Sequence, residues 1–386
     1  MKPYALDQTE ADWKQWATQH GHAPFVARQI REWIFAKGEL QPEGFTNISK
    51  AIRESLQEQF DWSLPTVDTV LSSADGSEKI LFRVRDGLFA ECVLMPSDKR
   101  ITLCISSQVG CRWGCTFCQT GRMGLTRSLS SGEILSQVIL ANHRLEEKKV
   151  SNVVFMGMGE PLDNFEAVVE VCRTLTDAKL FALSKHRVTV STVGLVPEIE
   201  RLGKEVAVSL AISLHSADNA HRASMMPVAR QYPLDVLKQT LLNYPIQTRH
   251  GITFEYVMIQ GENDSIQHAK QLVKFVHGLK AKVNLIPMNA HPGNPMQASE
   301  EIRLREFQKY LSDRSIPAPV RYSRGQDVSA ACGQLAMKRQ EELHLEPHKV
   351  ARSRKREIRD NRESVSADVN VSSDRTECDS EEHSVS

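Results

Sequence analysis

The sequence predicts an α/β protein in which a parallel sheet forms a barrel or an open partial barrel with helices outside. The first observation is that short apolar runs alternate with helical segments from about residue 150 to residue 313. Each strand–helix–strand unit implies a right-handed crossover between parallel strands, and about six such units are present. A group of hairpin-like strands before this series and a helical N-terminus are the other two observations. In such a fold, active residues belong at the C-terminal ends of the strands.

Residues 1–75 are expected to form a small helical accessory domain. Apolar side chains recur near helical spacing in two stretches, 24–38 and 48–60. A packing role and a substrate-holding role are equally compatible with this pattern.

Residues 76–345 are expected to form the barrel together with an N-terminal strand extension. The turn signals Asp86-Gly87 and Pro96 to Asp98 separate the first three strands, which therefore read as hairpins. The expected strands are 79–84, 88–95, 101–106, 153–157, 187–192, 206–214, 252–259 and 282–288. The expected helices between the later strands are 164–175, 195–203, 233–244, 265–278 and 301–313.

Residues 346–386 are expected to be a disordered, charged tail. The segment 349–362 carries seven Lys or Arg against two Asp or Glu, whereas 363–386 carries one Arg against seven acidic residues. With few large apolar side chains, this tail cannot offset the entropy lost on ordering. A solvated tail is the favoured interpretation, and a basic strip that touches RNA or an acidic partner is the alternative.

The composition narrows the class of protein. Lys plus Arg and Asp plus Glu number 48 each, which excludes a globally basic nucleic-acid binder but leaves a local basic groove open. There is no run of eighteen apolar residues and no secretory signal, so we expect no membrane association. Three of the eight cysteines fall within eight residues, unlike a secreted disulfide scaffold. A cytoplasmic protein with a metal or redox cluster fits better.

The segment from Cys111 through Cys115 to Cys118, directly after an expected strand, carries the chemistry. Its C-x3-C-x2-C spacing supplies three thiolates from one short loop. Thiolates bind iron–sulfur clusters, usually four to a cluster, so three would leave one iron open to another ligand. Zinc is the competing interpretation, but a closed zinc site needs a fourth Cys or His at recurring spacing, and none follows.

The same loop, with Phe117 before its last cysteine, is also the pattern of radical S-adenosylmethionine (SAM) enzymes. Six motifs occur in order: CISSQVGCRWGCTFC at 104–118, GMGEPLDN at 157–164, STVGLVP at 191–197, SLHSADNAHRASMMP at 213–227, NLIPMN at 284–289 and DVSAACGQL at 327–335. Together they resemble the family of radical SAM RNA adenine methyltransferases that contains RlmN and Cfr. The resemblance covers about residues 79–335, and the helical N-terminus looks similar too.

The resemblance implies a [4Fe–4S] cluster and two molecules of SAM per turnover. Cys111, Cys115 and Cys118 would bind three irons, and SAM would chelate the fourth. The residues that correspond to the family's SAM contacts are Gly159, Glu160, Ser191, Ser213, Leu214, His215 and Asn289. Several of them follow expected strands, as the fold requires of ligand contacts.

The resemblance also assigns roles to Cys332, Cys104 and Glu91. Because the adenine ring carbons C2 and C8 are electron-poor, they cannot attack SAM as nucleophiles. In the family, the residue matching Cys332 is first methylated by SAM, and a radical derived from a second SAM then removes hydrogen from that methyl group. The resulting methylene adds to the ring, a residue matching Glu91 takes the ring proton, and a thiol matching Cys104 releases the product by forming a disulfide.

The substrate implied by the resemblance is RNA. Methylation of adenine C2 in ribosomal RNA, with tRNA as a second substrate, is the expected activity, and C8 methylation is the alternative. An electron donor such as flavodoxin or ferredoxin and a monomeric enzyme are also expected. Flipping of an adenosine from a loop would present the base to the barrel mouth. Basic residues that could hold phosphates are Arg122, Arg127, Lys185, Arg187, Arg222 and Arg249.

Two further alternatives remain open on the sequence. A different radical SAM enzyme would not need the pair Cys104 and Cys332, and a zinc-stabilised RNA-binding protein would perform no catalysis. One departure from the family pattern is Gln119, where alanine commonly follows the last cluster cysteine; this residue is expected to reshape the cluster pocket slightly.

Overall fold

The computed structural model describes residues 2–146, 148–246, 251–289, 294–325 and 332–343. The chain divides into two units, Met1–Leu345 and Glu346–Ser386, and the described residues all belong to the first. The expected disorder of the tail therefore concerns a segment outside the described residues.

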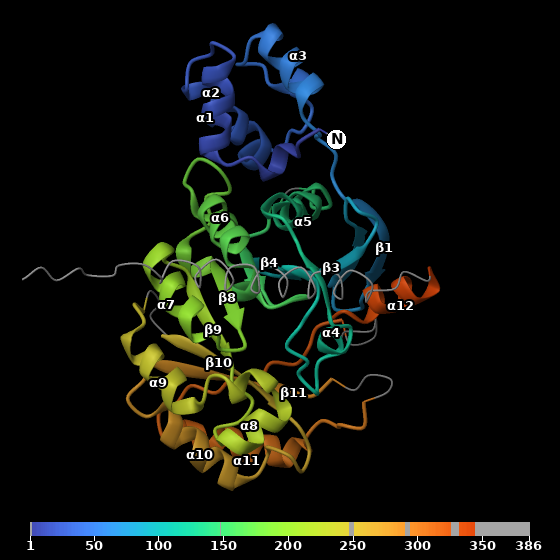
Figure 1. Cartoon of the computed structure of the whole chain (residues 1–386). Coiled ribbons are helices and arrows are strands. Elements are labelled where there is room, and N and C mark those ends of the chain that lie inside the picture. Colours follow the sequence, from blue (N-terminus) through green and yellow to red (C-terminus); the bar gives the residue numbers. More distant parts are fainter. Residues whose placement is uncertain (1, 147, 247–250, 290–293, 326–331, 344–386) are drawn as a thin grey trace, which may run out of the picture. The chain divides into compact units, whose positions relative to one another are not determined.

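The N-terminal helices form a cluster of their own, drawn in blue in Figure 1. It contains α1 (Glu10–Gln19), α2 (Phe25–Arg31) with a π-helical continuation (Glu32–Lys37), and α3 (Lys50–Gln59). The cluster has an aromatic core in which the rings of Trp13 and Phe60 lie 4.6 Å apart. Aromatic side chains bury large areas, so a few of them suffice to stabilise a domain this small.

The expectation of helix throughout residues 1–75 is wrong for its last part. The helical cluster ends with α3, and Thr66–Ser72 forms a strand, β1, which pairs with β2 (Glu78–Arg83) in antiparallel register. β1 contains four β-branched residues among its seven, and such residues favour a half-buried pleated surface over a helix.

A nine-stranded mixed sheet runs through the rest of the described chain (Figure 1), in the order β1-β2-β3-β4-β7-β8-β9-β10-β11. The first four strands pair antiparallel, and the six strands from β4 to β11 are parallel. The remaining strands of this sheet are β3 (Phe89–Ser97), β4 (Arg100–Cys104), β7 (Asn152–Phe155), β8 (Val188–Thr192), β9 (Ser209–Ser213), β10 (Ile252–Met258) and β11 (Ala281–Pro287). In the described residues β1 and β11 are its edges, so the barrel is open.

Helices follow the parallel strands along the chain and bury apolar side chains in the core. They are α5 (Ser131–His143), α6 (Phe165–Thr176), α7 (Val196–Glu205), α9 (Leu234–Asn243), α10 (Ile266–Val276) and α11 (Glu301–Ser312). The predicted α/β fold with a six-stranded open partial barrel, a hairpin extension and an N-terminal helical domain is thus confirmed. Of the helices in the described part of the chain, none combines the length and apolar character needed to cross a bilayer.

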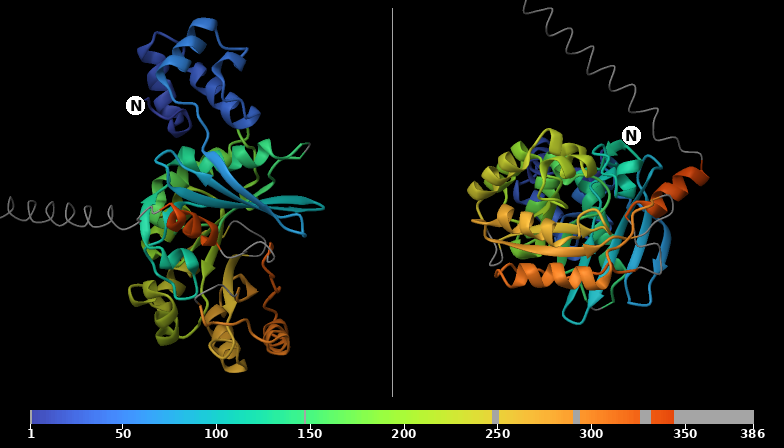
Figure 2. Two further views of the ribbon diagram at one scale, coloured as in Figure 1. Left: turned by 90° about the vertical axis from the view of Figure 1, so that its right-hand side faces the viewer. Right: turned by 90° about the horizontal axis from the view of Figure 1, so that it is seen from below.

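Three short helices do not belong to the outer layer. They are α4 (Gln119–Arg122), α8 (Asn219–Met225) and α12 (Gln334–Glu342). α12 contacts both β3 and α4, and Figure 2 shows it in red beside the hairpin strands. A two-stranded ribbon, β5 (Gln108–Gly110) with β6 (Leu125–Ser128), brackets the loop that contains Cys111.

Polar contacts tie the helical cluster to the outer helices. The buried guanidinium of Arg31 donates to Thr174 Oγ1 (2.8 Å) and to Glu170 Oε1 (3.2 Å) on α6. The Gly132 N–H at the start of α5 donates to Asp7 Oδ1 at 2.7 Å. Buried charge-assisted bonds are costly to break on one side, because the partner is left uncompensated.

Replacing Arg31 should therefore destabilise the protein. We expect Arg31→Met to lower the free energy of unfolding by about 2–4 kcal/mol, since it strands Glu170 and Thr174 without their donor. Urea unfolding followed by circular dichroism measures this. Arg28→Met is the matched control on the same helix: Arg28 pairs with Asp177 but its side chain is 35% exposed, so a loss within about 1 kcal/mol is expected. Equal losses for the two variants would contradict the assignment.

Candidate active site

The three cysteines of the C-x3-C-x2-C motif lie in the loop between β5 and α4. Backbone bonds fix the loop: Cys111 N–H donates to Gly124 O (2.9 Å), and Cys118 N–H donates to Cys115 O (3.1 Å). Gly114 has φ of +59°, a left-handed conformation that glycine adopts without steric cost. These bonds and this turn define the path of the loop backbone.

The chemistry of these thiols fits an iron–sulfur cluster. Burial raises the pKa of Cys111 to about 12, and it also raises the pKa of Cys115 and Cys118, with neighbouring thiols adding to the effect at Cys115. Thiolates in this loop consequently need a cationic partner, which a metal supplies. Three of the four ligands that such a cluster usually takes are then provided by one loop.

The arrangement gives less support to zinc. Within the described residues, no three His, Cys, Asp or Glu side chains converge as the ligands of a single metal ion do. A tetrahedral zinc site requires that convergence. In a four-iron cluster each thiolate binds a different iron, so the three sulfurs surround the cluster and do not converge on a single ion.

The turn after β7 is built for close backbone approach. Gly159 has φ of +100°, and a Cβ there would meet Gln108 Cβ at 2.5 Å, so no other residue fits. The carboxylate of Glu160 is buried and points inward: Oε1 accepts from Leu162 N–H (3.0 Å) and Oε2 from Val193 N–H (2.9 Å). Burial raises the pKa of Glu160 to about 7. The carboxylate thus ties this turn to the loop after β8.

Polar side chains line the inner face of the parallel sheet at its C-terminal end. Ser191 of β8 pairs with Ala211 of β9, and Ser213 of β9 pairs with Glu255 of β10. Because side chains alternate across a strand, these four residues share one face. Asn289 follows β11, and its Nδ2 donates to Ser323 Oγ at 2.6 Å. The structure therefore brings Ser191 and Ser213 together as neighbours on this face.

His215 contacts the cluster loop. It has φ of +57°, its Nδ1 accepts from Val257 N–H at 3.0 Å, and its ring meets Phe117 edge-on with centroids 4.7 Å apart. Burial, reinforced by the charge of Arg222, lowers the pKa of His215 to about 3. The imidazole is therefore neutral at physiological pH and carries its hydrogen on Nε2. The adjacent Leu214 is buried, with its N–H donated to Glu255 O at 3.0 Å.

Glu91, Lys79 and Cys104 share one face of the hairpin extension. Val93 pairs with both Lys79 and Cys104, and Glu91 lies two residues before Val93 on the same face. Glu91 is fully buried, and its Oε2 lies 3.3 Å from the Lys79 ammonium. Glu91 does not face water, because α12 covers that face of β3.

Glu91 also holds the segment that contains Cys332. The Gly333 N–H donates to Glu91 Oε2 (3.1 Å), and the Ala336 N–H donates to Oε1 (2.7 Å), so the carboxylate caps the N-terminus of α12. Thr120 Oγ1, directly after the cluster loop, donates to Cys332 O at 3.1 Å. Thr120 and Glu91, each more than 200 residues before Cys332 in sequence, thus hold its segment between the cluster loop and β3.

Cys332 and Cys104 are free thiols, and neither forms a disulfide in this structure. Burial raises the pKa of Cys332 well above its usual range; the charges of Cys104 and Glu91 add to this, while Lys79 opposes it. Burial likewise raises the pKa of Cys104 to about 12. The two sulfurs therefore lie within electrostatic range of each other, of one carboxylate and of one ammonium.

The sequence missed some of these residues and misplaced another. Lys79 and Thr120 were not singled out, although a lysine opening an apolar strand is a detectable signal. The Nε2 of Gln119 lies 2.9 Å from Met337 Sδ on α12, and the effect of this residue on the cluster pocket stays a prediction. Arg222 does not hold phosphates at the surface, because it is 1% exposed.

Two of the other basic residues proposed to hold phosphates are already bonded to protein groups. Arg127 is held by Asp86 and by both oxygens of Glu133, and Arg187 donates to Asn152 Oδ1 (2.7 Å). Arg249 lies outside the described residues. Arg127 and Arg187 are thus partly committed to protein partners.

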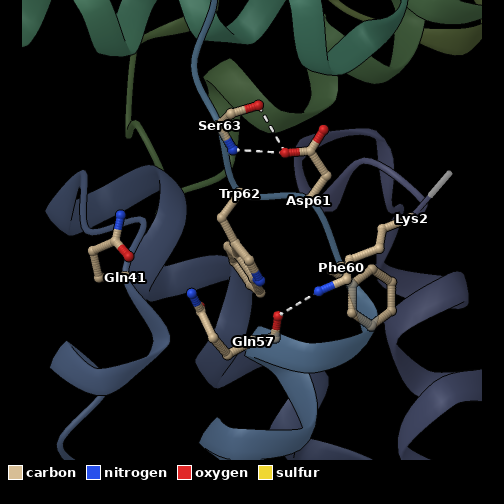
Figure 3. Close-up of a pocket in the computed structure, with 7 residues that line it drawn as sticks. All are labelled: Lys2, Gln41, Gln57, Phe60, Asp61, Trp62 and Ser63. Atoms are coloured by element: carbon tan, nitrogen blue, oxygen red, sulfur yellow. Dashed lines mark hydrogen bonds between the residues drawn. The ribbon is translucent and has the colours of Figure 1, made fainter.

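A hollow of about 480 Å³ lies in the helical cluster, lined by residues that include Phe60, Asp61 and Trp62 (Figure 3). Its polar groups pair with one another: Ser63 Oγ donates to Asp61 Oδ1 (2.7 Å), and Lys2 Nζ donates to Gln57 O (3.3 Å). None of its lining residues belongs to the sheet or to the cluster loop. The chemistry instead gathers at the strand ends.

An open six-stranded parallel barrel whose first strand leads into a C-x3-C-x2-C loop defines a radical SAM enzyme. The Radical SAM superfamily model matches residues 105–275, and the Ribosomal RNA large subunit methyltransferase N-terminal domain model matches residues 5–61.

Curated relatives narrow the class. The chain is 43% identical over 337 residues to the Dual-specificity RNA methyltransferase RlmN of Syntrophobacter fumaroxidans, which covers 87% of this chain and 98% of that protein. It is 44% identical over 335 residues to the protein of the same name from Geotalea uraniireducens, with coverage of 87% and 96%. The crystal structure of a radical SAM methyltransferase from Sphaerobacter thermophilus superposes with a TM-score of 0.81 at 40% identity, covering 86% of this chain and 98% of that one. The chain belongs to the RlmN family of radical SAM methyltransferases.

One consequence of the buried inner face is testable through pH. Burial raises the pKa of Glu255 from 4.5 to about 7, against the opposing hydrogen bond from Asn284 and the charges of Lys282 and Arg321. The folded protein therefore binds this proton more tightly than the unfolded chain. This contribution to stability is complete below about pH 4.5 and is lost as the pH rises through about 7.

Glu255→Gln should remove that dependence. Relative to the parent, the variant should gain about 1–3 kcal/mol of unfolding free energy between pH 5 and pH 8. Urea midpoints at both pH values measure the gain. Glu54→Gln, at a side chain that is 67% exposed, should show none. A parent and a Glu255→Gln variant with parallel pH profiles would exclude a buried, proton-binding Glu255.

Proposed function

We propose that this enzyme methylates adenine C2 in RNA, with 23S rRNA and tRNA as substrates, through an S-methylcysteine on Cys332. The observation that carries the proposal is the meeting of Cys332, Cys104 and Glu91 beside the loop that contains Cys118. A radical SAM enzyme with another substrate has no need for this second pair of thiols. The words "dual-specificity RNA methyltransferase" in the names of the relatives support two RNA substrates.

In this proposal Cys111, Cys115 and Cys118 hold a [4Fe–4S] cluster. SAM binds at the strand ends, with its amino group at the turn of Gly159 and Glu160. The other contacts we assign to SAM are Ser191, Ser213, Leu214, His215 and Asn289. When bound, the cluster would supply one electron that cleaves the sulfonium of SAM. The radical formed in this way could take a hydrogen atom from a methyl group.

The chain's own residues then hold and resolve the adduct. The Cys332 sulfur would carry the transferred carbon from one SAM to the adenine ring, and a second SAM would supply the radical that abstracts hydrogen. Glu91, whose charge acts on that sulfur, would accept the ring proton, and the one electron that the radical adduct loses with it would return to the cluster. The Cys104 thiolate attacks the Cys332 sulfur; the sulfur–carbon bond breaks, its electrons pass to the carbon, and that carbon takes a proton. Cys104 and Cys332 leave as a disulfide, which a cellular dithiol must reduce.

We further infer that the enzyme works in the cytoplasm as a monomer with a flavodoxin or ferredoxin as electron donor. The proposed division of labour assigns catalysis to residues 76–345, an accessory role to residues 1–75, and no catalytic role to the tail 346–386. The uncommitted cysteines in the described chain, Cys92 and Cys172, are buried core residues in this scheme.

The cluster assignment predicts a defined metal load. Protein prepared anaerobically should contain about four iron and four sulfide per chain, and replacing Cys111, Cys115 or Cys118 by Ala should remove both. Metal and acid-labile sulfide analysis measures this. Cys172→Ala, at a buried thiol on α6, is the matched control and should keep the full load. A variant with all three cysteines replaced and an unchanged iron content would contradict the assignment of these cysteines as cluster ligands.

The two separated thiols predict different failures. Cys332→Ala should abolish RNA methylation and keep the cluster, since no cluster ligand is touched. Cys104→Ala should still form the adduct but should not release it, and protein covalently joined to RNA through Cys332 should accumulate. Mass spectrometry of nuclease-treated protein detects the nucleotide remnant.

The Cys92→Ala variant, changed at a buried neighbour on β3, should methylate RNA normally and trap none.

Nucleoside analysis of RNA from cells with and without the gene separates 2-methyladenosine from 8-methyladenosine by chromatography. A Cys104→Ala enzyme that turns over without trapped RNA would remove the thiol-resolution step, and 8-methyladenosine as the product would replace the C2 assignment.

A further inference from the structure

Arg222 is a fully buried cation at the strand ends. It lies on α8, in a segment that the sequence suggested for phosphate contacts, yet it is 1% exposed. A guanidinium so far from water is retained only where anions or carbonyl oxygens satisfy its five N–H groups.

Part of the guanidinium binds the loops that end two strands. Nε donates to Leu214 O (3.2 Å), and Nη2 donates to Val193 O (2.7 Å) and to Ser213 O (3.3 Å). Val193 follows β8, and Ser213 ends β9. Arg222 thus links the C-terminal ends of the two strands that carry the proposed SAM contacts Ser191 and Ser213.

The other part of the guanidinium lacks an acceptor. Nη1 is buried and has no hydrogen-bond partner among the described residues. Because burying a charged donor without an acceptor is unfavourable, the position of Nη1 indicates an anionic partner supplied from outside the chain.

The same helix holds the cluster loop. At the C-terminal end of α8, Met225 O accepts from Thr116 N–H at 2.9 Å, and Thr116 is the residue after Cys115. This backbone hydrogen bond therefore holds α8, and Arg222 with it, against the cluster loop.

We propose that Nη1 of Arg222 donates a hydrogen bond to an anionic acceptor of the bound cofactors, either a sulfur of the cluster beside Cys115 or the carboxylate of SAM. This inference rests on the proposed assignment of Cys111, Cys115 and Cys118 as cluster ligands. A positive charge at this place stabilises the more negative, reduced form of a cluster and orients an anionic ligand.

Three variants test the proposal on anaerobically reconstituted protein without RNA. Arg222→Met removes the charge, Arg222→Lys keeps it, and Arg222→Gln keeps a donor without the charge. Arg31→Met is the matched control, because Arg31 is also buried and bonded to oxygen acceptors but lies on α2. The readouts are the midpoint potential of the cluster without SAM and the dissociation constant of SAM.

If the acceptor is a cluster sulfur, Arg222→Met should shift the potential to more negative values without SAM, and Arg222→Lys should restore most of the shift. If the acceptor is the SAM carboxylate, the potential should stay and SAM affinity should fall about ten-fold or more, again with recovery in Arg222→Lys. The proposal is overturned when Arg222→Met matches Arg31→Met in both readouts.

Should Arg222→Met fail to load iron, the comparison of Arg222→Lys with Arg222→Gln decides. A Lys variant that resembles the parent while the Gln variant does not supports the proposal, and equal values for the two overturn it. Failure of the proposed function can be distinguished from failure of this inference, because these measurements need no RNA. If the enzyme leaves adenine unmethylated but shows the Arg222 effects, the inference stands and the proposed function does not.

Discussion

The candidate active site depends on one buried carboxylate. Glu91 has no water to solvate it, so its charge is compensated by the Lys79 ammonium and by the N–H groups of Gly333 and Ala336 at the start of α12. Each of these contacts crosses from one element to another. The hairpin extension, which lies outside the six parallel strands, therefore determines where Cys332 sits, because only its third strand offers a carboxylate to that helix end.

The opposite side of the site is organised by backbone bonding. α8 holds the cluster loop through Thr116 and Met225, and the ribbon of β5 and β6 closes it through Cys111 and Gly124. Thr120, which follows this loop, donates a hydrogen bond from its Oγ1 to the Cys332 carbonyl oxygen. The cluster thiols and the second pair of thiols are thus held by separate sets of contacts that meet at one short helix, α4.

Much of the fold was predictable because strand and helix periodicities are local properties. The strands from 101–106 onward and the helices between them occur as expected, and so does the hairpin turn at Asp86-Gly87. The expectation failed at β1, where a strand occupies a segment assigned to the helical domain. β1 is an edge strand that pairs with β2 alone among the described strands, so its conformation depends on that partner as well as on its β-branched residues.

The sequence by itself determined the family, the thiol-rich loop and the order of the strand-end motifs, because these are fixed by residue type and spacing along the chain. Only the tertiary structure decided which side chains are buried and what they face. It turned Glu91 from an ambiguous strand residue into the cap of α12, brought Lys79 beside it, directed Gln119 to Met337, and placed Arg222 inside the protein. The physical reason is that charge compensation and hydrogen bonding act between residues close in space, and the separations here reach 245 residues between Glu91 and Ala336.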